Sequence, residues 1–121
     1  MGVDEVVTAY GAAWNEPDPQ ARRELLLQAW TDEGIYTDPT ASADGRDALI
    51  EHISGFQAAM PGHTIETTSG IDAHGDFFRF AWQMRHGTEV ALEGMDFGVL
   101  AADGRISRIV GFFGPFPSIP E

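Results

Sequence analysis

Asp96 is the residue of this 121-residue sequence whose surroundings point most directly to chemistry. It lies in the stretch Glu93–Gly98 and has a glycine two positions away on either side. If this stretch is a β-strand, Asp96 shares one face with both glycines, and the missing side chains predict a hollow beside a carboxylate. A carboxylate on a mainly apolar face must be hydrogen-bonded, paired or neutralised, because burying a bare charge is very costly.

Asp38 is the second candidate. It ends a short predicted strand, Ile35–Asp38, because Pro39 cannot continue a hydrogen-bonded ladder. A carboxylate at a strand end can point into a cleft and remove a proton next to a carbonyl group. It could equally cap the loop 40–44, because Asp-Pro pairs are common in plain turns.

Helical periodicity predicts three helices before the strands. The first runs from Val3 to about Asn15, the second starts at Pro19 after the N-cap Asp18 and reaches Trp30, and the third starts at Gly45 and stops before Pro61. Tyr10 and Trp14 lie on the apolar face of the first helix, and His52 and Phe56 on that of the third. We expect a polar loop at 40–44, strands at 63–69 (with 70–73 as an extension), 77–86, 89–101 and 105–113, and an irregular tail at 114–120.

The two hairpin turns predict a register for the last three strands. A two-residue loop at 87–88 pairs Arg79 with Asp96, and a turn at 103–104 pairs Asp96 with Gly111 and Leu100 with Ser107. One concave face then lines a cavity with Arg79, Ala81, Gln83, Leu92, Asp96, Ile109 and Phe113.

The opposite sheet face is too apolar to meet water. It would carry Phe78, Phe80, Trp82, Met84, Met95, Phe97, Val99, Val110 and Phe112. Three helices can cover only one side of so small a sheet, so this face predicts a homodimer. The two faces could be exchanged, but the glycines favour the first as the cavity wall.

Composition narrows the class of protein. The length predicts one domain over residues 1–121, and no apolar run is long enough to span a membrane. Seven basic against nineteen acidic residues give a net charge of −12, which argues against nucleic acid and anionic membranes as partners. No signal-peptide pattern opens the chain, so we expect a cytoplasmic protein. The histidines show no metal-ligand spacing, and we expect neither a metal nor another cofactor.

The order of these features resembles the nuclear transport factor 2-like superfamily, and within it the SnoaL-like polyketide cyclases and the ketosteroid isomerases. The resemblance rests on the strand ending Tyr36-Thr37-Asp38-Pro39, the helix entered at Gly45-Arg46-Asp47, and Gly94-Met95-Asp96-Phe97 followed by Asp103-Gly104-Arg105-Ile106. It implies an α+β fold in which three N-terminal helices pack on a strongly curved antiparallel sheet, a cystatin-like roll forming a cone around an apolar pocket.

The resemblance also implies roles for single residues. Asp38 matches the general base of ketosteroid isomerases, Asp96 matches their second aspartate, and Tyr10 falls near their oxyanion-hole tyrosine, an arrangement in which a protonated aspartate donates a hydrogen bond. His52 resembles a pocket-lining position. Arg79 is similar to the arginine of limonene epoxide hydrolases, but Ala81 stands where those enzymes have an aspartate.

The leading hypothesis is therefore acid-base proton transfer, an isomerisation or cyclisation, on a small apolar carbonyl compound. Asp38 would be the base, and Tyr10, a protonated Asp96 or Arg79, helped by His52, would stabilise the oxyanion. Trp14, Phe56 and the sheet residues above would contact the ligand. The alternatives are a non-catalytic pocket for a small ligand and an epoxide hydrolase in which two carboxylates hold a water molecule.

Overall fold

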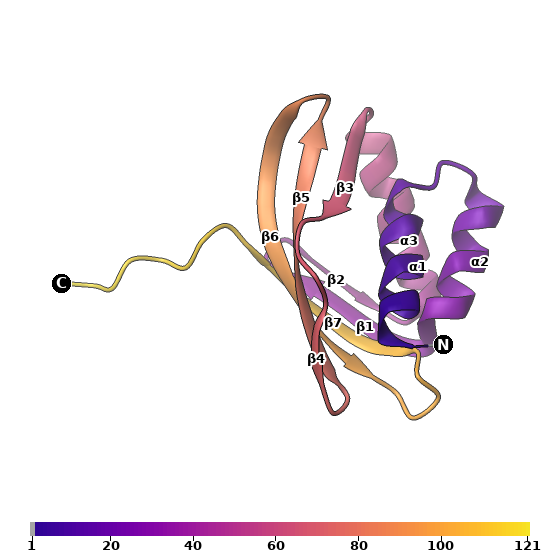
Figure 1. Ribbon diagram of the computed structural model, residues 1–121. Helices are drawn as coiled ribbons and strands as arrows, with labels where there is room; N and C mark the ends of the chain where they lie inside the picture. The colour runs from indigo at the N-terminus through magenta and orange to yellow at the C-terminus, as the bar shows by residue number, and fades with distance from the viewer. Residues whose placement is uncertain (1) are drawn as a thin grey trace.

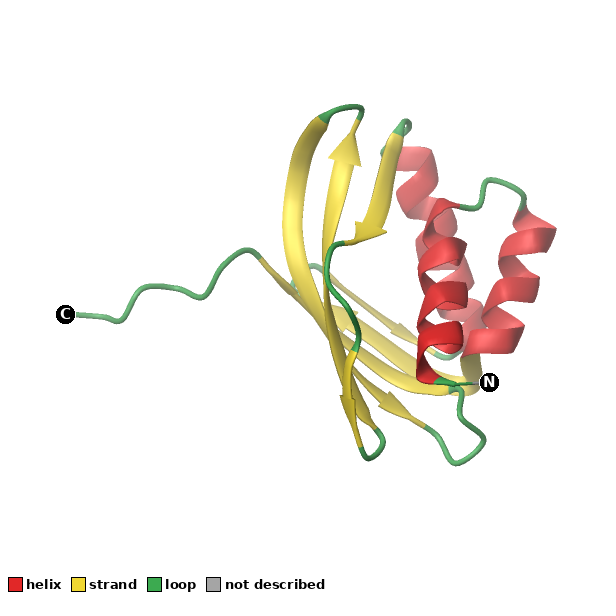
Figure 2. Cartoon of the chain, in the orientation of Figure 1, coloured by secondary structure: helices red, strands yellow, loops and turns green. Residues whose placement is uncertain are grey.

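Three helices cover one side of a curled seven-stranded sheet in the computed structural model, which describes residues 2–121 (Figure 1). The helices are α1 (Val3–Asn15), α2 (Pro19–Ala29) and α3 (Arg46–Ala59). The strands are β1 (Trp30–Asp38), β2 (Ala41–Asp44), β3 (His63–Thr67), β4 (Asp72–His74), β5 (Phe77–His86), β6 (Glu89–Leu100) and β7 (Ile106–Phe113). Figure 2 shows that the helices lie on the concave side of the sheet, whereas its convex side bears none. The α+β cone expected from the sequence is confirmed.

The helices begin and end close to the predicted positions. The Asp18 carboxylate accepts a hydrogen bond from the Ala21 amide at 3.0 Å, and Pro19 occupies the first turn of α2. Gly45 precedes α3 with a φ of 94°, a backbone conformation that favours glycine. No helix within residues 2–121 is both long and apolar enough to cross a membrane.

The first half of the sheet differs from the prediction in two places. Strand β1 starts at Trp30, five residues before Ile35, and the expected loop 40–44 contains strand β2. These two strands form an antiparallel hairpin in which Asp38 pairs with Ala41. Ala43 is buried while its neighbours are exposed, so the short polar run alternates as a strand does.

One strand pair makes the sheet mixed and not wholly antiparallel. The strand order is β2-β1-β7-β6-β5-β3, with β4 also paired to β5, and β1 runs parallel to β7. In that pair Tyr36 lies beside Ile109 and Thr37 beside Val110. The end of β1, which carries Asp38, therefore meets β7 near Gly111.

The predicted register of β6 and β7 is confirmed around the key carboxylate. Asp96 pairs with Gly111, Gly98 with Ile109 and Gly94 with Phe113. An irregularity between Val99 and Leu100 places Leu100 opposite Ile106 and not Ser107.

The predicted register of β5 and β6 is wrong by one residue over most of its length. The hairpin starts as expected with His86 opposite Glu89, but a bulge between Met84 and Arg85 shifts the pairing, so Phe80 and not Arg79 faces Asp96. A shift of one residue moves every side chain of a strand to the other face. The cavity side of β5 therefore carries Phe78, Phe80, Trp82 and Met84, and the outer side carries Arg79, Ala81 and Gln83.

Candidate active site

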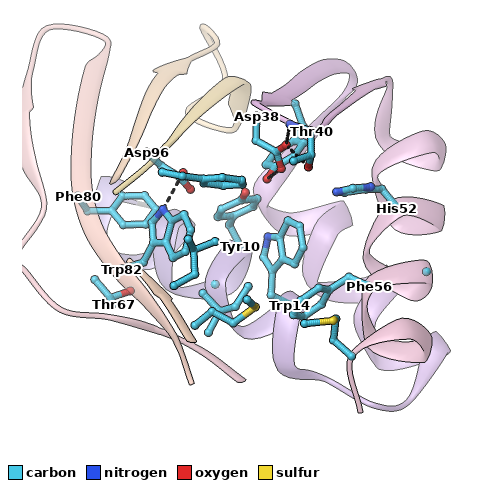
Figure 3. Close-up of a pocket in the computed structure, with 18 of the residues that line it drawn as sticks. Tyr10, Trp14, Asp38, Thr40, His52, Phe56, Thr67, Phe80, Trp82 and Asp96 are labelled. Atoms are coloured by element: carbon cyan, nitrogen blue, oxygen red, sulfur yellow. Dashed lines mark hydrogen bonds between the residues drawn. The ribbon is translucent and has the colours of Figure 1, made fainter. Parts of the chain in front are cut away.

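A cavity of about 640 Å³ lies between the concave sheet face and helices α1 and α3. Figure 3 shows Asp96, Trp82 and Phe80 on its sheet side, His52 and Phe56 on the α3 side, and Tyr10 and Trp14 between them. Its walls are mostly aromatic or aliphatic, and none of the lining residues found within 2–121 is a lysine or an arginine. The lining residues are Tyr10, Gly11, Trp14, Tyr36, Asp38, Thr40, His52, Gly55, Phe56, Ala59, Met60, Ile65, Thr67, Phe80, Trp82, Met84, Leu92, Asp96 and Phe113.

Asp96 is a buried carboxyl group on the wall of this cavity. Asp96 is only 7% exposed, and the Trp82 indole nitrogen donates a hydrogen bond to its Oδ1 atom at 3.0 Å. Burial raises the pKa of Asp96 to about 7, and the charge of Asp38 contributes in the same direction, while the Trp82 hydrogen bond opposes the rise. Both protonation states of Asp96 are therefore populated near neutral pH.

The two glycines beside Asp96 do not leave a hollow, contrary to the expectation from the sequence. Gly94 pairs with Trp82 and Gly98 with Phe78 across the β5–β6 ladder. A Cβ atom at either glycine would clash with the aromatic ring opposite it. The glycines therefore let these rings lie flat on the sheet, and in this way the Trp82 indole reaches Asp96.

Asp38 lies at the end of β1 with both carboxylate oxygens hydrogen-bonded. The Tyr36 hydroxyl donates to Oδ2 at 2.6 Å, and the amide and hydroxyl of Thr40 donate to Oδ1 at 2.7 and 2.8 Å. Partial burial raises the pKa of Asp38, but the hydrogen bonds from Tyr36 and Thr40 and the nearby His52 outweigh it, so the net pKa is lowered. Asp38 is thus held as a carboxylate and is a weaker base than Asp96.

Gly111 brings the two aspartates together. It pairs with Asp96 on β6, and β1 runs along its other side. A Cβ atom at Gly111 would lie 3.0 Å from Asp96 Oδ1 and 3.4 Å from the Asp38 Cβ atom. Two carboxyl groups that are 58 positions apart in the sequence therefore flank one point of the cavity wall.

Tyr10 lines the cavity and has a hydroxyl group that can donate a hydrogen bond to an oxyanion. It is 2% exposed, and its ring stacks on Trp30 with 5.5 Å between ring centroids. Burial raises the pKa of Tyr10 well above its ordinary value, and the charge of Asp96 adds to this, so the hydroxyl stays protonated. Unlike the Tyr36 hydroxyl, it makes no hydrogen bond to either aspartate within residues 2–121.

The other helix residues expected at the site also reach the cavity. Trp14 meets the rings of His52 and Phe56 edge to face, at centroid distances of 5.7 and 5.5 Å. His52 lies on the α3 side, also 5.4 Å from the Tyr36 ring. Leu92 and Phe113 line the sheet side as expected.

Four predicted sheet residues do not line the cavity. Arg79, Ala81 and Gln83 lie on the outer side because of the shifted β5 register, and Ile109 is fully buried in the core. Arg79 donates to Asp72 at 2.8 Å, with both side chains about two-thirds exposed, and not to Asp96. The arginine suggested by the epoxide hydrolases is therefore outside the cavity. Within residues 2–121, no three or more His, Asp or Glu residues are grouped to hold a metal ion.

Sequence reasoning missed several cavity residues, most importantly Tyr36 and Trp82, which hydrogen-bond the two aspartates. Tyr36 lies two positions before Asp38 on one strand, so the strand period of two could have placed both on one face. On β5, the aromatic and methionine side chains occupy alternate positions, and arginine and glutamine occupy most of the others. Placing the more apolar set inward would have identified Phe80, Trp82 and Met84.

A family model and a solved structure both relate this chain to the same family. A family model for the SnoaL-like domain matches residues 7–109. A crystal structure described as a "putative isomerase of the SnoaL-like family" from Agrobacterium tumefaciens str. C58 has 32% sequence identity and a TM-score of 0.85, over 91% of this chain and 95% of that one. No curated protein matches the chain significantly.

Two more distant structures share the fold. An NTF2-like protein of unknown function from Exiguobacterium sp. 255-15 has 18% identity and a TM-score of 0.74, over 92% of this chain and 99% of that one. A "putative polyketide cyclase" from Sinorhizobium meliloti has 18% identity and a TM-score of 0.69, over 88% of this chain and 92% of that one.

Proposed function

We propose that this chain, which belongs to the SnoaL-like family, is a cofactor-independent enzyme that moves a proton within a small apolar carbonyl compound, by isomerisation or cyclisation. The observation that carries the proposal is the Asp96 carboxyl group, whose pKa is about 7 and which faces a largely apolar cavity. A general base works best when its pKa is close to the working pH. Two structural relatives are named a "putative isomerase" and a "putative polyketide cyclase", and both names belong to this class of chemistry.

In the proposed reaction Asp96 carries the proton. Its ionised form removes a proton from the carbon next to the carbonyl group, and its neutral form returns that proton at a second atom of the same substrate. The hydrogen bond from Trp82 holds one carboxylate oxygen, which leaves the other to act. The overall reaction needs no oxidant or added group, because the proton leaves and returns.

Tyr10 is assigned to the carbonyl oxygen. Its hydroxyl stays protonated because burial raises its pKa, so it can donate a hydrogen bond to the negative charge that develops on that oxygen. No lysine or arginine of residues 2–121 lines the cavity to share this task.

Asp38 is not assigned the role of base. It acts through Asp96, whose pKa its charge helps to raise. Its oxygens already accept three hydrogen bonds, from Tyr36 and Thr40. Its charge helps to keep the pKa of Asp96 high, because a second negative charge nearby disfavours ionisation. His52 offers a polar ring on the α3 side, where it could orient a second polar group of the ligand.

The test compares Asp96→Asn with Asp38→Asn in a screen of small ketones with terpenoid, steroid-like and polyketide skeletons. Binding is followed by quenching of tryptophan fluorescence, because Trp14 and Trp82 line the cavity. We expect Asp96→Asn to keep ligand affinity within a few-fold and to lose at least about 100-fold in turnover, and Asp38→Asn to lose less.

Arg79→Gln, on the outer sheet side, is the matched control and should keep full turnover. Binding without turnover for every compound would instead make the protein a non-catalytic pocket for small ligands. Equal turnover of Asp96→Asn and the unmodified protein would exclude Asp96 as the proton carrier.

A further inference from the structure

We propose that the cavity takes a carbonyl compound with a positively charged amino group, and that Asp38 and the aromatic rings around it hold this charge. The proposal rests on the proposed function, because it names the class of substrate for the same cavity. It concerns binding, however, and it can fail while the proton transfer stands. Three features of the described chain support it: the charges that line the cavity, the rings near Asp38, and the unused hydrogen-bonding capacity of the two carboxyl groups.

The cavity wall carries negative charge that no cation of the described chain balances. Asp38 and Asp96 flank one point of this wall (Figure 3). The sequence has no lysine, and five of its seven arginines form ion pairs with other carboxylates. Of the other two, Arg22 donates to Ser54 and to other uncharged groups, and Arg108 is exposed on β7. None of the seven lines the cavity that residues 2–121 form, so a cationic ligand would supply the missing partner.

Aromatic rings surround the Asp38 end of the cavity. The ring of Tyr36, whose hydroxyl donates to Asp38, is inclined by 51° to that of Trp14, with 5.6 Å between centroids. Phe56 meets Trp14 at 73°, and all three rings line the cavity. The face of a tyrosine or tryptophan ring attracts a cation within about 6 Å of its centroid. These rings and a carboxylate can together replace the water around an ammonium group, as aliphatic walls could not.

Both carboxyl groups keep room for a donor from a ligand. A carboxylate can accept about four hydrogen bonds. Asp38 accepts three, from Tyr36 and Thr40, and Asp96 accepts one, at Oδ1, from Trp82. Burial raises the pKa of Asp38, but its hydrogen bonds outweigh this and the net pKa is lowered. Asp38 therefore offers a permanent negative charge near neutral pH, whereas the charge of Asp96 varies with pH.

A bound cation would also act on Asp96. Burial raises the pKa of Asp96 to about 7, and the charge of Asp38 adds to this rise. A positive charge near both carboxyl groups favours ionised Asp96, which is the form that removes a proton. Among the other titratable groups that line the cavity, Tyr10 and Tyr36 stay neutral because burial raises the pKa of each, and a protonated His52 would repel the ligand.

The experiment compares three acetophenones that differ only in the group at the para position. The groups are trimethylammoniomethyl, its neutral isostere neopentyl, and the anion sulfonatomethyl. Calorimetry gives the dissociation constant of each at pH 8. We expect the cation to bind at least about tenfold more tightly than the neutral compound, and the anion to bind most weakly. Equal or tighter binding of the neutral compound would overturn the proposal.

Asp38→Asn removes the permanent charge and keeps the size of the side chain. We expect it to weaken binding of the cation at least about tenfold and to change that of the neutral compound less than about threefold. Asp44→Asn is the matched control, because it removes one charge from an exposed position of the β1–β2 hairpin, outside the cavity, and both affinities should stay unchanged. Unchanged affinity of Asp38→Asn for the cation would contradict the proposal.

A spectroscopic measurement on the unmodified protein needs no variant. The titration midpoint of the Asp96 carboxyl chemical shift should fall by about one pH unit when the cation is bound, and it should not fall with the neutral compound. A midpoint that the cation leaves in place would count against a charge held beside the two aspartates.

Hydrogen exchange of the acetyl methyl group in D₂O separates this proposal from the proposed reaction. Exchange that requires Asp96, without any preference for the cation, would overturn the ligand class and leave the reaction standing. A preference for the cation without exchange would support the ligand class and contradict the reaction.

Discussion

The two buried charged side chains of the described chain, Arg22 and Asp96, have opposite environments. Arg22 is 4% exposed and Asp96 is 7% exposed, so both have lost most of their contact with bulk water. The Arg22 guanidinium donates to the carbonyl oxygens of Glu16 and Pro17 and to the side chains of Ser54 and Gln57. Asp96 accepts one hydrogen bond from the protein, from Trp82.

The difference separates a structural charge from a reactive one. The carbonyl groups that follow α1 carry partial negative charge, and they replace water around Arg22 without a carboxylate partner. Arg22 therefore joins the α1–α2 connection to α3 in one fixed arrangement. Asp96 lacks comparable support, and the consequence is a raised pKa beside an open cavity.

The largest expected effect is on the pH dependence of stability. The pKa of Asp96 is about 7 in the folded protein, against about 3.9 in an unfolded chain. The folded state then binds the proton more tightly, so the free energy of unfolding should fall as the pH rises from about 4 to 8, by up to about 4 kcal/mol. Urea denaturation at pH 5 and pH 8 measures the larger part of this fall, about 2.6 kcal/mol. It should be absent in Asp96→Asn, and an equal fall in both proteins would contradict the raised pKa.

Removal of the Arg22 guanidinium should be the next largest effect. Arg22→Met removes the hydrogen bonds that the guanidinium donates to Ser54, to Gln57 and to the part-buried carbonyl groups of Glu16 and Pro17, so we expect a loss of about 3 kcal/mol in unfolding free energy. The neighbouring Arg23→Met is the control, because its ion pair with Asp47 is largely exposed and should contribute little. Equal losses in both variants would remove the distinction between buried and exposed arginine.

Trp82→Phe should change the titration of Asp96 by about one pH unit. Loss of the indole donor removes the hydrogen bond that lowers the pKa of Asp96, so the pKa should rise further above its usual range. The midpoint of Asp96 ionisation, measured from the acidic limb of the turnover profile or from the carboxyl chemical shift, should move to higher pH. Trp14→Phe alters the cavity wall without removing a hydrogen bond to Asp96, and should leave that midpoint in place.

The smallest effect is expected for Arg79→Gln. Its ion pair with Asp72 is about two-thirds exposed on both sides, so the unfolding free energy should change by less than about 0.5 kcal/mol. The titration of Asp96 should be unchanged. A raised pKa of Asp96 in this variant would support the register in which Arg79 faces the carboxylate, because loss of a facing positive charge disfavours ionisation.

Local sequence signals predicted much of the fold and part of the site. The Asp18-Pro19 pair and the glycine turns placed the helices and the β6–β7 register, and both aspartates reach one cavity as expected. The bulge between Met84 and Arg85 could not be predicted from the turn alone, because a hairpin loop specifies only the pairs next to it. This shift of one residue in the pairing exchanged the two faces of β5. It moved Arg79 out of the cavity and Trp82 into it.

The hydrogen bonds between Asn15 and strand β3 have a consequence for the rate of ligand exchange. Its side-chain amide donates to the Ile65 carbonyl at 2.6 Å and accepts from the Ile65 amide at 2.8 Å, as a neighbouring strand would. Ile65 lies on edge strand β3 and lines the cavity, so this pair of hydrogen bonds fastens one wall of the cavity to α1. We expect the rates at which bulky ligands enter and leave the cavity to depend on how often the two Asn15–Ile65 hydrogen bonds break, even where the affinity of the ligands stays constant.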